Sequence, residues 1–169
     1  MINVHAIANR VIRSIHPNET FIVVRSIGYQ NNYGVLTYEY GNCEQASGQM
    51  QSLNGDEHKL TNEIAHIEIS RKLFISVSGS PLTAGRFDTQ EGATFLYQVS
   101  TGDFWKLFNV SEDFSKCTWA TVFISLMPWE SSPIEVRQAL KASSYGNLVK
   151  DKEIEPNVNE PPIQRLLLV

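Results

Sequence analysis

The chain has 169 residues, a hydrophobic content of 42% and a formal net charge of -4 at pH 7. That length lets one domain bury its own core, and the composition is typical of a globular protein. The acidic balance argues against a dedicated nucleic-acid-binding protein, which normally carries a basic stripe. Cys43 and Cys117 are too few and too far apart for a disulfide framework or a metal cluster, so they favour a reducing, intracellular setting. The first residues hold no apolar signal-peptide core and no apolar run approaches about eighteen residues, so we expect neither a secretion signal nor a membrane span.

Residues 3–15 predict an amphipathic helix. Apolar side chains recur there at the three-to-four spacing of one helical face, at Val4, Ile7, Ala8, Val11, Ile12 and Ile15. Asn3 is a suitable N-cap, and Pro17 ends the helix. A helix of this length is marginal alone in water, so we expect its apolar stripe to dock on the sheet or on a neighbouring subunit.

The pattern then changes to the period of β-strands. We expect strands at Thr20–Ile27 and Val35–Tyr40, joined by a hairpin turn within Tyr29–Gly34. Further short strands are expected at Gly48–Leu53, within Ile64–Val77, and at Leu82–Phe87. Leu53–Glu63 is polar and predicts a loop or a short helical turn.

The segment from Gly92 to Met127 holds three runs rich in β-branched and aromatic residues. Polar turns are predicted at Ser100–Asp103 and Ser111–Asp113, and this spacing is typical of consecutive antiparallel strands. Trp105 and Trp119 lie on two of these strands and carry the largest apolar surfaces of the region. We therefore predict that this meander is the core sheet against which the rest of the chain packs.

A second helix is predicted over residues 133–142. Ser132 in the N-cap position, Pro133 in the first helical position and Glu135 three residues after Ser132 form the pattern of a capping box. This favours a short helix directly after the meander.

The segment from Ser143 onward holds glycine, proline, charged and amide residues, a composition that cannot build its own core. It finishes in the apolar run Leu166–Val169, and we interpret it as an extended arm with a docking tip. The alternative is a frayed tail. Residues 1–128 are thus expected to form a helix plus an antiparallel β-barrel or sandwich, mainly β in class, and residues 129–169 a short helix and an extended C-terminal arm.

The sequence contains no motif that carries catalysis. No nucleophile elbow, phosphate-binding loop or dinucleotide fingerprint is present, and the four histidines lack metal-ligand spacing. His58 follows Asp56 and Glu57, a weak candidate for a metal site, and a solvated loop is the favoured interpretation. We therefore expect no catalytic residue, no cofactor and no bound metal.

Two further groups of residues have more than one interpretation. Glu112 and Asp113 are paired carboxylates, but in a turn such pairs are more often turn formers than an acid and a base. Trp105 and Trp119 favour core filling over a stacking platform for sugars or bases. Trp129, beside Pro128, is the tryptophan to which we assign an interface role. The candidate partner interface consists of Trp129, Ile163, Leu166, Leu167, Leu168 and Val169.

Six motifs occur in a recognisable order between residues 3 and 127. They are a helix with a Pro-Asn turn at Ile7–Asn18, an Arg-Ser-x-Gly-Tyr strand end at Arg25–Tyr29, a Gln-containing strand at Gly48–Leu53, an Arg-led strand at Arg71–Ile75, a Gly-Asp turn before Trp at Gly102–Trp105, and a Trp-containing strand at Thr118–Leu126. In this order they resemble a family of neck proteins, the collar or head–tail connector proteins of contractile-tailed bacteriophages. The chain departs from that pattern at Gly92–Thr94, where a more glycine-rich, acidic start is expected, and residues 128–169 extend beyond the usual core of the family.

The resemblance implies a virion structural protein and not an enzyme. It implies a collar or head-completion (stopper-like) subunit, located in the virion neck between capsid and tail and assembled in the host cytoplasm. The implied assembly is a sixfold or twelvefold homo-oligomeric ring that joins the portal or connector protein to tail-terminator, gateway or tail-tube proteins. Genomic DNA would pass through its lumen without sequence-specific binding, and no membrane is involved.

Two alternatives stay open. One is the tail-terminator role in the same neck. The other, from a different class, is a small β-barrel carbohydrate-binding module or enzyme that uses Glu112, Asp113 and the tryptophans.

Overall fold

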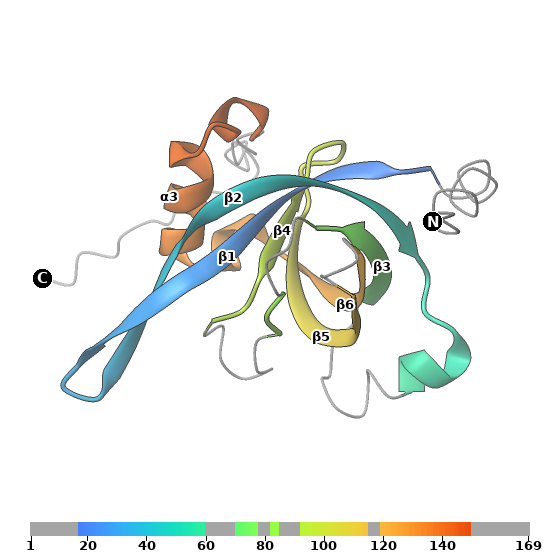
Figure 1. The fold of residues 1–169 in the computed structure, drawn as a ribbon, viewed down its shortest axis with the longest axis horizontal. Coiled ribbons are helices and arrows are strands. Elements are labelled where there is room, and N and C mark those ends of the chain that lie inside the picture. The colour runs from blue at the N-terminus through green and yellow to red at the C-terminus, as the bar shows by residue number, and fades with distance from the viewer. Residues whose placement is uncertain (1–16, 60–69, 78–81, 85–91, 115–118, 150–169) are drawn as a thin grey trace, which may run out of the picture.

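The computed structural model describes residues 17–59, 70–77, 82–84, 92–114 and 119–149. Within these ranges the chain forms one antiparallel sheet, whose strands are β1 (Glu19–Asn32), β2 (Val35–Gln51), β3 (Ser70–Ser76), β4 (Phe95–Gln98), β5 (Phe104–Phe114) and β6 (Trp119–Met127). The sheet closes in a ring in the order β1-β2-β3-β6-β5-β4, with β4 pairing back onto β1 (Figure 1). Because the strands range from 4 to 17 residues in length, the ring is not a regular barrel.

The described helices follow the sheet or connect its strands. They are the 3₁₀-helix η2 (Trp129–Ser131), the α-helix α3 (Ile134–Ala142), the 3₁₀-helix η3 (Gly146–Leu148) and a helical turn at residues 55–59. No helix among the described residues has the length and apolar character needed to cross a membrane.

The inside of the ring is filled by alternate side chains of the strands. This first core cluster includes Phe21, Val23, Leu73, Ile75, Leu96, Trp105, Leu107, Ala120, Val122 and Ile124. Alternation along a strand places every second side chain on the same face, so the inward residues of neighbouring strands meet in the middle. Burial of these side chains from water stabilises the closed sheet.

A second core cluster lies on the outer face of β1 and β4. Ile22 and Val24 alternate with the inward residues of β1 and pack with Phe95 and Tyr97 of β4. The helix α3 covers this face and also packs against β2, and its Val136 and Leu140, both fully buried, belong to the cluster. Both faces of the sheet are buried where β1 pairs with β4. For this reason Phe21–Val24 of β1 and Phe95–Tyr97 of β4 are continuous apolar runs.

The structure confirms the mainly β class and the order of the central meander. β4, β5 and β6 are antiparallel neighbours, and Trp105 is buried in the first core cluster, as predicted. Every strand of the ring has a paired neighbour on each side over part of its length, but the ring is not the regular barrel that was one of the two expected architectures. The predicted helix at residues 3–15 and residues 150–169 of the predicted arm lie outside the described residues.

The first two strands are longer than predicted. β1 continues through Tyr29 to Asn32, so the predicted turn at Tyr29–Gly34 is reduced to Tyr33 and Gly34. The two strands predicted at Val35–Tyr40 and Gly48–Leu53 are one strand, β2. The polar stretch between them is held in the strand because Gly41 and Glu44–Ser47 pair with β1, with a register shift at Asn42, whose φ is 45°; local composition does not reveal this long-range contact.

The turn predicted at Ser111–Asp113 is wrong. These residues belong to β5, where Glu112 stands opposite Thr121 and Asp113 opposite Ala120 of β6. Register shifts in this pairing lie between Leu107 and Asn109 and between Val110 and Glu112.

The strand predicted at Leu82–Phe87 is not seen in its described part. Residues 82–84 form no strand, and the remainder of that segment is not described. Leu82 nevertheless belongs to the first core cluster, which explains the apolar residue at this position.

The C-terminal helix is confirmed, but its predicted capping box does not form. Pro133 occupies the N-cap position, and the Ser132 hydroxyl donates a 2.6 Å hydrogen bond to the carbonyl oxygen of Trp129. That carbonyl belongs to the preceding helix η2, which the capping pattern could not anticipate. The chain after α3 remains packed on the second core cluster through Tyr145, Leu148 and Val149, so an arm can begin only after Val149.

Two glycines, Gly28 of β1 and Gly48 of β2, differ in how closely a neighbouring strand approaches them. A Cβ added at Gly48 would stand 2.8 Å from Leu73 Cδ1 and 3.0 Å from the Phe74 carbonyl oxygen, whereas one added at Gly28 would meet nothing within 4 Å. Gly48→Ala should therefore lower the free energy of unfolding by about 1–3 kcal/mol through overpacking. Gly28→Ala should change it by less than about 0.5 kcal/mol. Chemical denaturation of both variants measures the difference, and equal effects would contradict the close approach of β2 and β3.

Candidate functional site

The β1–β2 hairpin continues beyond the ring. β1 pairs with β4 only over Phe21–Val24, and β2 pairs with β3 only over Ser47–Gln51. Beyond these points the two strands pair, among the described residues, only with each other and form a two-stranded ribbon. The base of this ribbon still packs on the body, through Tyr40 on Phe95 of the second core cluster and Tyr38 beside Gly92, and its outer part leaves the body of the molecule (Figure 1). We call residues 25–41 the projecting hairpin.

The tip of the projecting hairpin is a tight two-residue turn. Tyr33 and Gly34 have φ angles of 54° and 89°, in the left-handed region that glycine enters readily and tyrosine seldom. Two successive residues with positive φ match the twist of the flanking strands, as in the type I′ turn. The Asn31 side-chain oxygen accepts a 2.9 Å hydrogen bond from the Gly34 N–H, which helps to hold this geometry.

The base of the hairpin is held by polar pairs between its strands. The guanidinium of Arg25, a largely buried residue, forms an ion pair with Glu44 of β2. Further out, the Gln30 side-chain amide donates a hydrogen bond to the Glu39 carboxylate. Register shifts lie between Val23 and Arg25 and between Ser26 and Gly28, so the ribbon changes its twist just as it leaves the ring.

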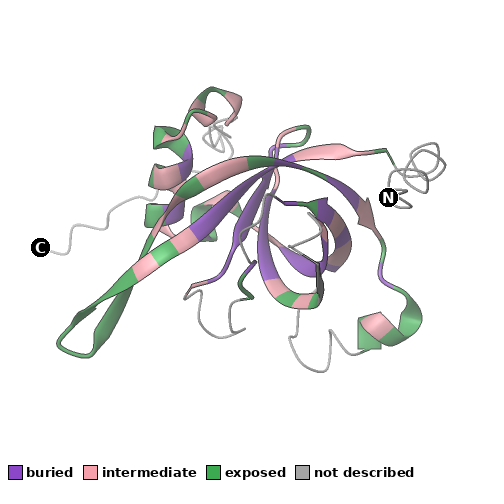
Figure 2. Ribbon diagram, in the orientation of Figure 1, coloured by how far each residue is buried: buried purple, intermediate pink, exposed green. Residues whose placement is uncertain are grey.

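The exposed apolar surface of the described chain is concentrated on this hairpin. Of the six large apolar side chains that are exposed among the described residues, five lie here: Ile27, Tyr29, Tyr33, Val35 and Leu36. Figure 2 shows both strands of the ribbon as exposed toward the tip, in contrast to the buried strands of the ring. Clusters of exposed apolar side chains commonly mark interaction sites.

Apolar side chains lie on both faces of the ribbon. Tyr29 stands opposite Tyr38, with ring centroids 5.8 Å apart, and Leu36 shares their face. Val35 is on the other face, and the Ile27 side chain lies against Gly41 on that same face. A ribbon that is apolar on both faces is suited to being covered from both sides, as buried strands are.

Trp129, predicted at the interface, contributes to the second core cluster. Its ring meets Phe104 edge-on with centroids 5.5 Å apart, and Tyr97 with centroids 6.3 Å apart. It is partly buried and closes the cluster at the end of β6. The other predicted interface residues, Ile163 and Leu166–Val169, lie outside the described residues.

Of the residues of the carbohydrate or enzyme alternative, Trp105 does not lie on the surface. Trp105 is buried inside the ring, and its indole N–H donates a 3.1 Å hydrogen bond to the Gln98 side-chain oxygen. Gln98 in turn donates to the Glu19 carboxylate and to the Ser100 hydroxyl. This indole is thus used in a structural hydrogen-bond network and presents no stacking face.

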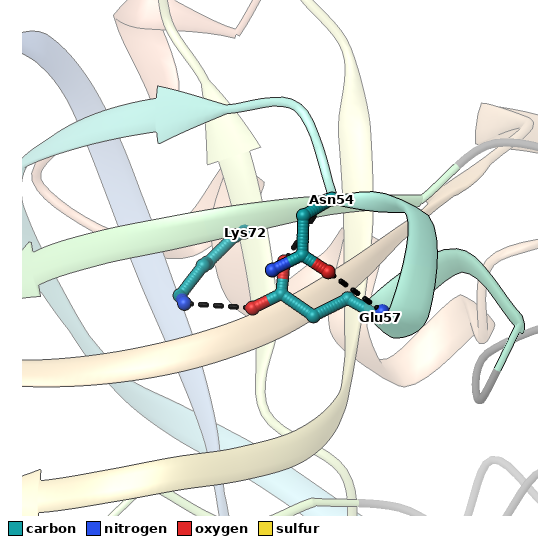
Figure 3. A network of polar contacts seen from close by, with 3 residues as sticks. All are labelled: Asn54, Glu57 and Lys72. Atoms are coloured by element: carbon teal, nitrogen blue, oxygen red, sulfur yellow. Dashed lines mark hydrogen bonds and ion pairs between the residues drawn. The ribbon is translucent and has the colours of Figure 1, made fainter.

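A second polar network joins the helical turn at residues 55–59 to β3. The Glu57 carboxylate accepts a 2.8 Å hydrogen bond from Lys72 Nζ and a 2.9 Å bond from the Asn54 N–H (Figure 3). The Asn54 side chain accepts from the Glu57 N–H, so the two residues cap the turn reciprocally. The ammonium of Lys72, together with the Asn54 N–H, lowers the pKa of the Glu57 carboxyl. Within the described ranges no three His, Cys, Asp or Glu side chains are grouped to hold a metal ion.

Cys43 is the cysteine that the structure describes. Its thiol lies between β2 and α3, where the Sγ is 3.6 Å from the carbonyl oxygen of Ala139. Burial raises the pKa of this thiol, which is opposed in part by a hydrogen bond with Ser143. The protonated thiol therefore packs as a small apolar group.

The projecting hairpin was not among the predicted interface residues. The signal for it was present in part, because Tyr29 and Tyr33 occupy a stretch predicted as a turn, where large apolar residues are unusual. The sequence could not reveal that β1 and β2 extend beyond the strands that pair with them in the ring. This extra length leaves the side chains in solvent.

Comparison with protein-family models gives no match for this chain, and comparison with curated proteins gives none either.

The Glu57–Lys72 pair predicts a pH dependence of stability. Since the folded-state pKa of Glu57 lies below its ordinary value near about 4.3, its carboxylate stabilises the folded state above that pH, and this contribution is lost as the pH falls through the folded-state pKa. Glu57→Gln should cost about 1 kcal/mol near neutral pH, because this ion pair is only partly buried and solvent still screens it. The difference from the unchanged protein should shrink and vanish as the pH falls through the folded-state pKa of Glu57.

Denaturant titrations across this pH range measure the effect. Asp56→Asn, which removes an exposed carboxylate one residue away, controls for the general loss of negative charge at the turn. A stability difference for Glu57→Gln that stays constant down to acidic pH would contradict the role of the carboxylate.

Proposed function

We propose that this chain is a virion structural protein, a collar or head-completion subunit that forms a ring between the portal and the tail of a contractile-tailed bacteriophage. Two findings support the proposal. The first is the ordered resemblance of residues 3–127 to the neck proteins. The second is the projecting hairpin, which carries most of the exposed large apolar side chains of the described residues.

The hairpin is the observation that carries the proposal. A ring repeats one heterologous contact around a closed axis, so each subunit needs two different complementary surfaces. A rigid ribbon that projects from the body and is apolar on both faces supplies one such surface. The ion pair between Arg25 and Glu44 and the tight turn at Tyr33 and Gly34 preorganise it, which reduces the ordering cost of assembly.

The proposed partners follow from the position in the neck. They are further copies of this chain in a sixfold or twelvefold ring, the portal or connector protein on the capsid side, and tail-terminator, gateway or tail-tube proteins on the tail side. Genomic DNA passes through the lumen. The net charge of -4 supports passage without adhesion, because nonspecific DNA affinity comes mainly from basic side chains that neutralise phosphates.

The tail-terminator role in the same neck is the second candidate. The two roles differ in which protein of the virion the oligomeric ring contacts. The carbohydrate-binding or enzymatic alternative is less favoured because Trp105 is buried in the core and hydrogen-bonded to Gln98. Binding of this protein to a glycan array that is lost in Trp129→Ala, without loss of the fold, would favour that alternative instead.

Assembly of the purified chain tests the proposal. Native mass spectrometry and electron microscopy should show a closed ring of six or twelve copies, either alone or when the portal protein is added. Deletion of residues 156–169 should leave the thermal unfolding of the domain within a few degrees of that of the full chain, because the composition of the chain after Ser143 cannot build a core. The same deletion should impair ring formation.

A chain that forms no closed ring alone or with the portal protein would contradict the proposal. Loss of the folded core on deletion of residues 156–169 would show instead that the arm packs within its own subunit.

A further inference from the structure

We propose that residues 163–169 of one copy add as a strand to the outer edge of β1 in the projecting hairpin of a neighbouring copy. The inference rests on the proposed function and names the contact between neighbouring subunits in the proposed oligomeric ring. Three observations carry it: an open strand edge, apolar side chains on both faces of the ribbon, and a complementary distribution of charge.

The outer edge of β1 is open beyond the ring. Pairing with β4 ends at Val24, so among the residues that the structure describes β1 is paired on one side only from Arg25 to Asn32. The unpaired backbone groups of such an edge can pair with a further strand. Proteins usually prevent this with charged side chains, lysine above all, or with proline. Ser26–Asn32 contains none of these side chains, and beyond the register shift between Ser26 and Gly28 its pairing with β2 is regular from Gly28 to Asn32. The outer edge of β2, in contrast, carries Glu39 and Glu44.

The side chains of the segment match those of the ribbon. In an added strand, successive side chains point to opposite faces, so the consecutive apolar residues Leu166–Val169 would place apolar groups on both faces. The ribbon offers apolar neighbours on both faces, with Tyr29 on one and Ile27 on the other. Strand addition supplies affinity through main-chain hydrogen bonds and specificity through such alternate contacts.

The charges are complementary. Between Ser26 and Gly41 the projecting hairpin carries one charged residue, Glu39, and between residues 163 and 169 the chain carries one, Arg165. The two have opposite signs. A contact between these segments therefore brings no like charges together, which favours this pairing over that of two hairpins, each with its own Glu39.

The exposed apolar residues offer surface for such a contact. A large aromatic side chain such as that of Tyr29 buries about 150–250 Å², and the exposed fractions of the five large apolar residues on the hairpin run from 38% to 107%. Ile27 and Tyr29 lie on β1, beside the proposed strand, whereas Val35 and Leu36 lie on β2. The added strand therefore covers part of this surface, less than the roughly 800 Å² that a standard interface buries on each partner, and main-chain hydrogen bonds along the edge supply further affinity.

The tether is long enough. Val149 is the last described residue, and residues 150–162 precede the proposed strand. Thirteen residues span up to about 45 Å when extended, which lets the segment reach beyond its own subunit.

Photocrosslinking locates the contact. The photoreactive residue p-benzoylphenylalanine replaces Tyr29 in the full chain, and isotopically light and heavy subunits are mixed, assembled and irradiated. Mass spectrometry should identify crosslinks from position 29 to residues 163–169, with light–heavy pairs among them. The same photoreactive residue at Ile134, which is 58% exposed on α3, is the matched control and should give no crosslink to that segment.

Each outcome decides a different point. A ring whose position 29 crosslinks to another segment overturns the inference and leaves the proposed function standing. Crosslinks to residues 163–169 that are only within single chains also overturn it, because the arm then docks on its own subunit. A chain that stays monomeric with the portal protein present overturns both.

Substitutions give an independent measurement of the same contact. Ile27→Asp should weaken ring assembly by at least about tenfold, because it places a charge against an apolar strand. Ile134→Asp makes the same change at a side chain of similar exposure, 58% against 54%, and should change assembly by less than about twofold.

Discussion

The pairing of β1 with β4 is the contact on which the rest of the structure depends. It joins the first hairpin of the chain to the central meander and closes the sheet in a ring. The four residues of β1 in this pairing, Phe21–Val24, are fully buried, with alternate side chains inside the ring and under α3. One short stretch therefore serves both core clusters, and its loss would open the sheet and uncover the helix at the same time.

The short extent of this pairing also creates the projecting hairpin. β4 has 4 residues, whereas β1 has 14 and β2 has 17, so the two long strands cannot be covered by the ring along their whole length. The excess length leaves the body as a ribbon with open edges and apolar side chains on both faces. The same difference in strand length that makes the ring irregular thus produces the surface that we propose to mediate assembly.

The polar side chains near the ring stabilise turns and strand ends. Glu57 links a helical turn to Lys72 of β3, and Gln98 joins Trp105 in the core to Glu19 at the start of β1. Ser132 ties the start of α3 back to η2. These contacts hold the body in one arrangement, and a rigid body is what gives a projecting ribbon a defined direction.

The sequence by itself determined the local elements. The strands of the meander, the helix that begins near Ile134 and the turn at Gly34 follow from side-chain period, β-branched content and the conformational freedom of glycine. Only the tertiary structure decided that β2 is one strand, that Ser111–Asp113 continues β5, and that Ser132 bonds to Trp129 and does not cap α3. It also decided which apolar residues stay in solvent: Tyr29 and Phe95 are both aromatic residues in strands, but one is exposed and the other is buried beneath α3. The physical reason is that each of these features depends on a partner distant in the chain, and local pattern carries no information about which distant strand or helix supplies it.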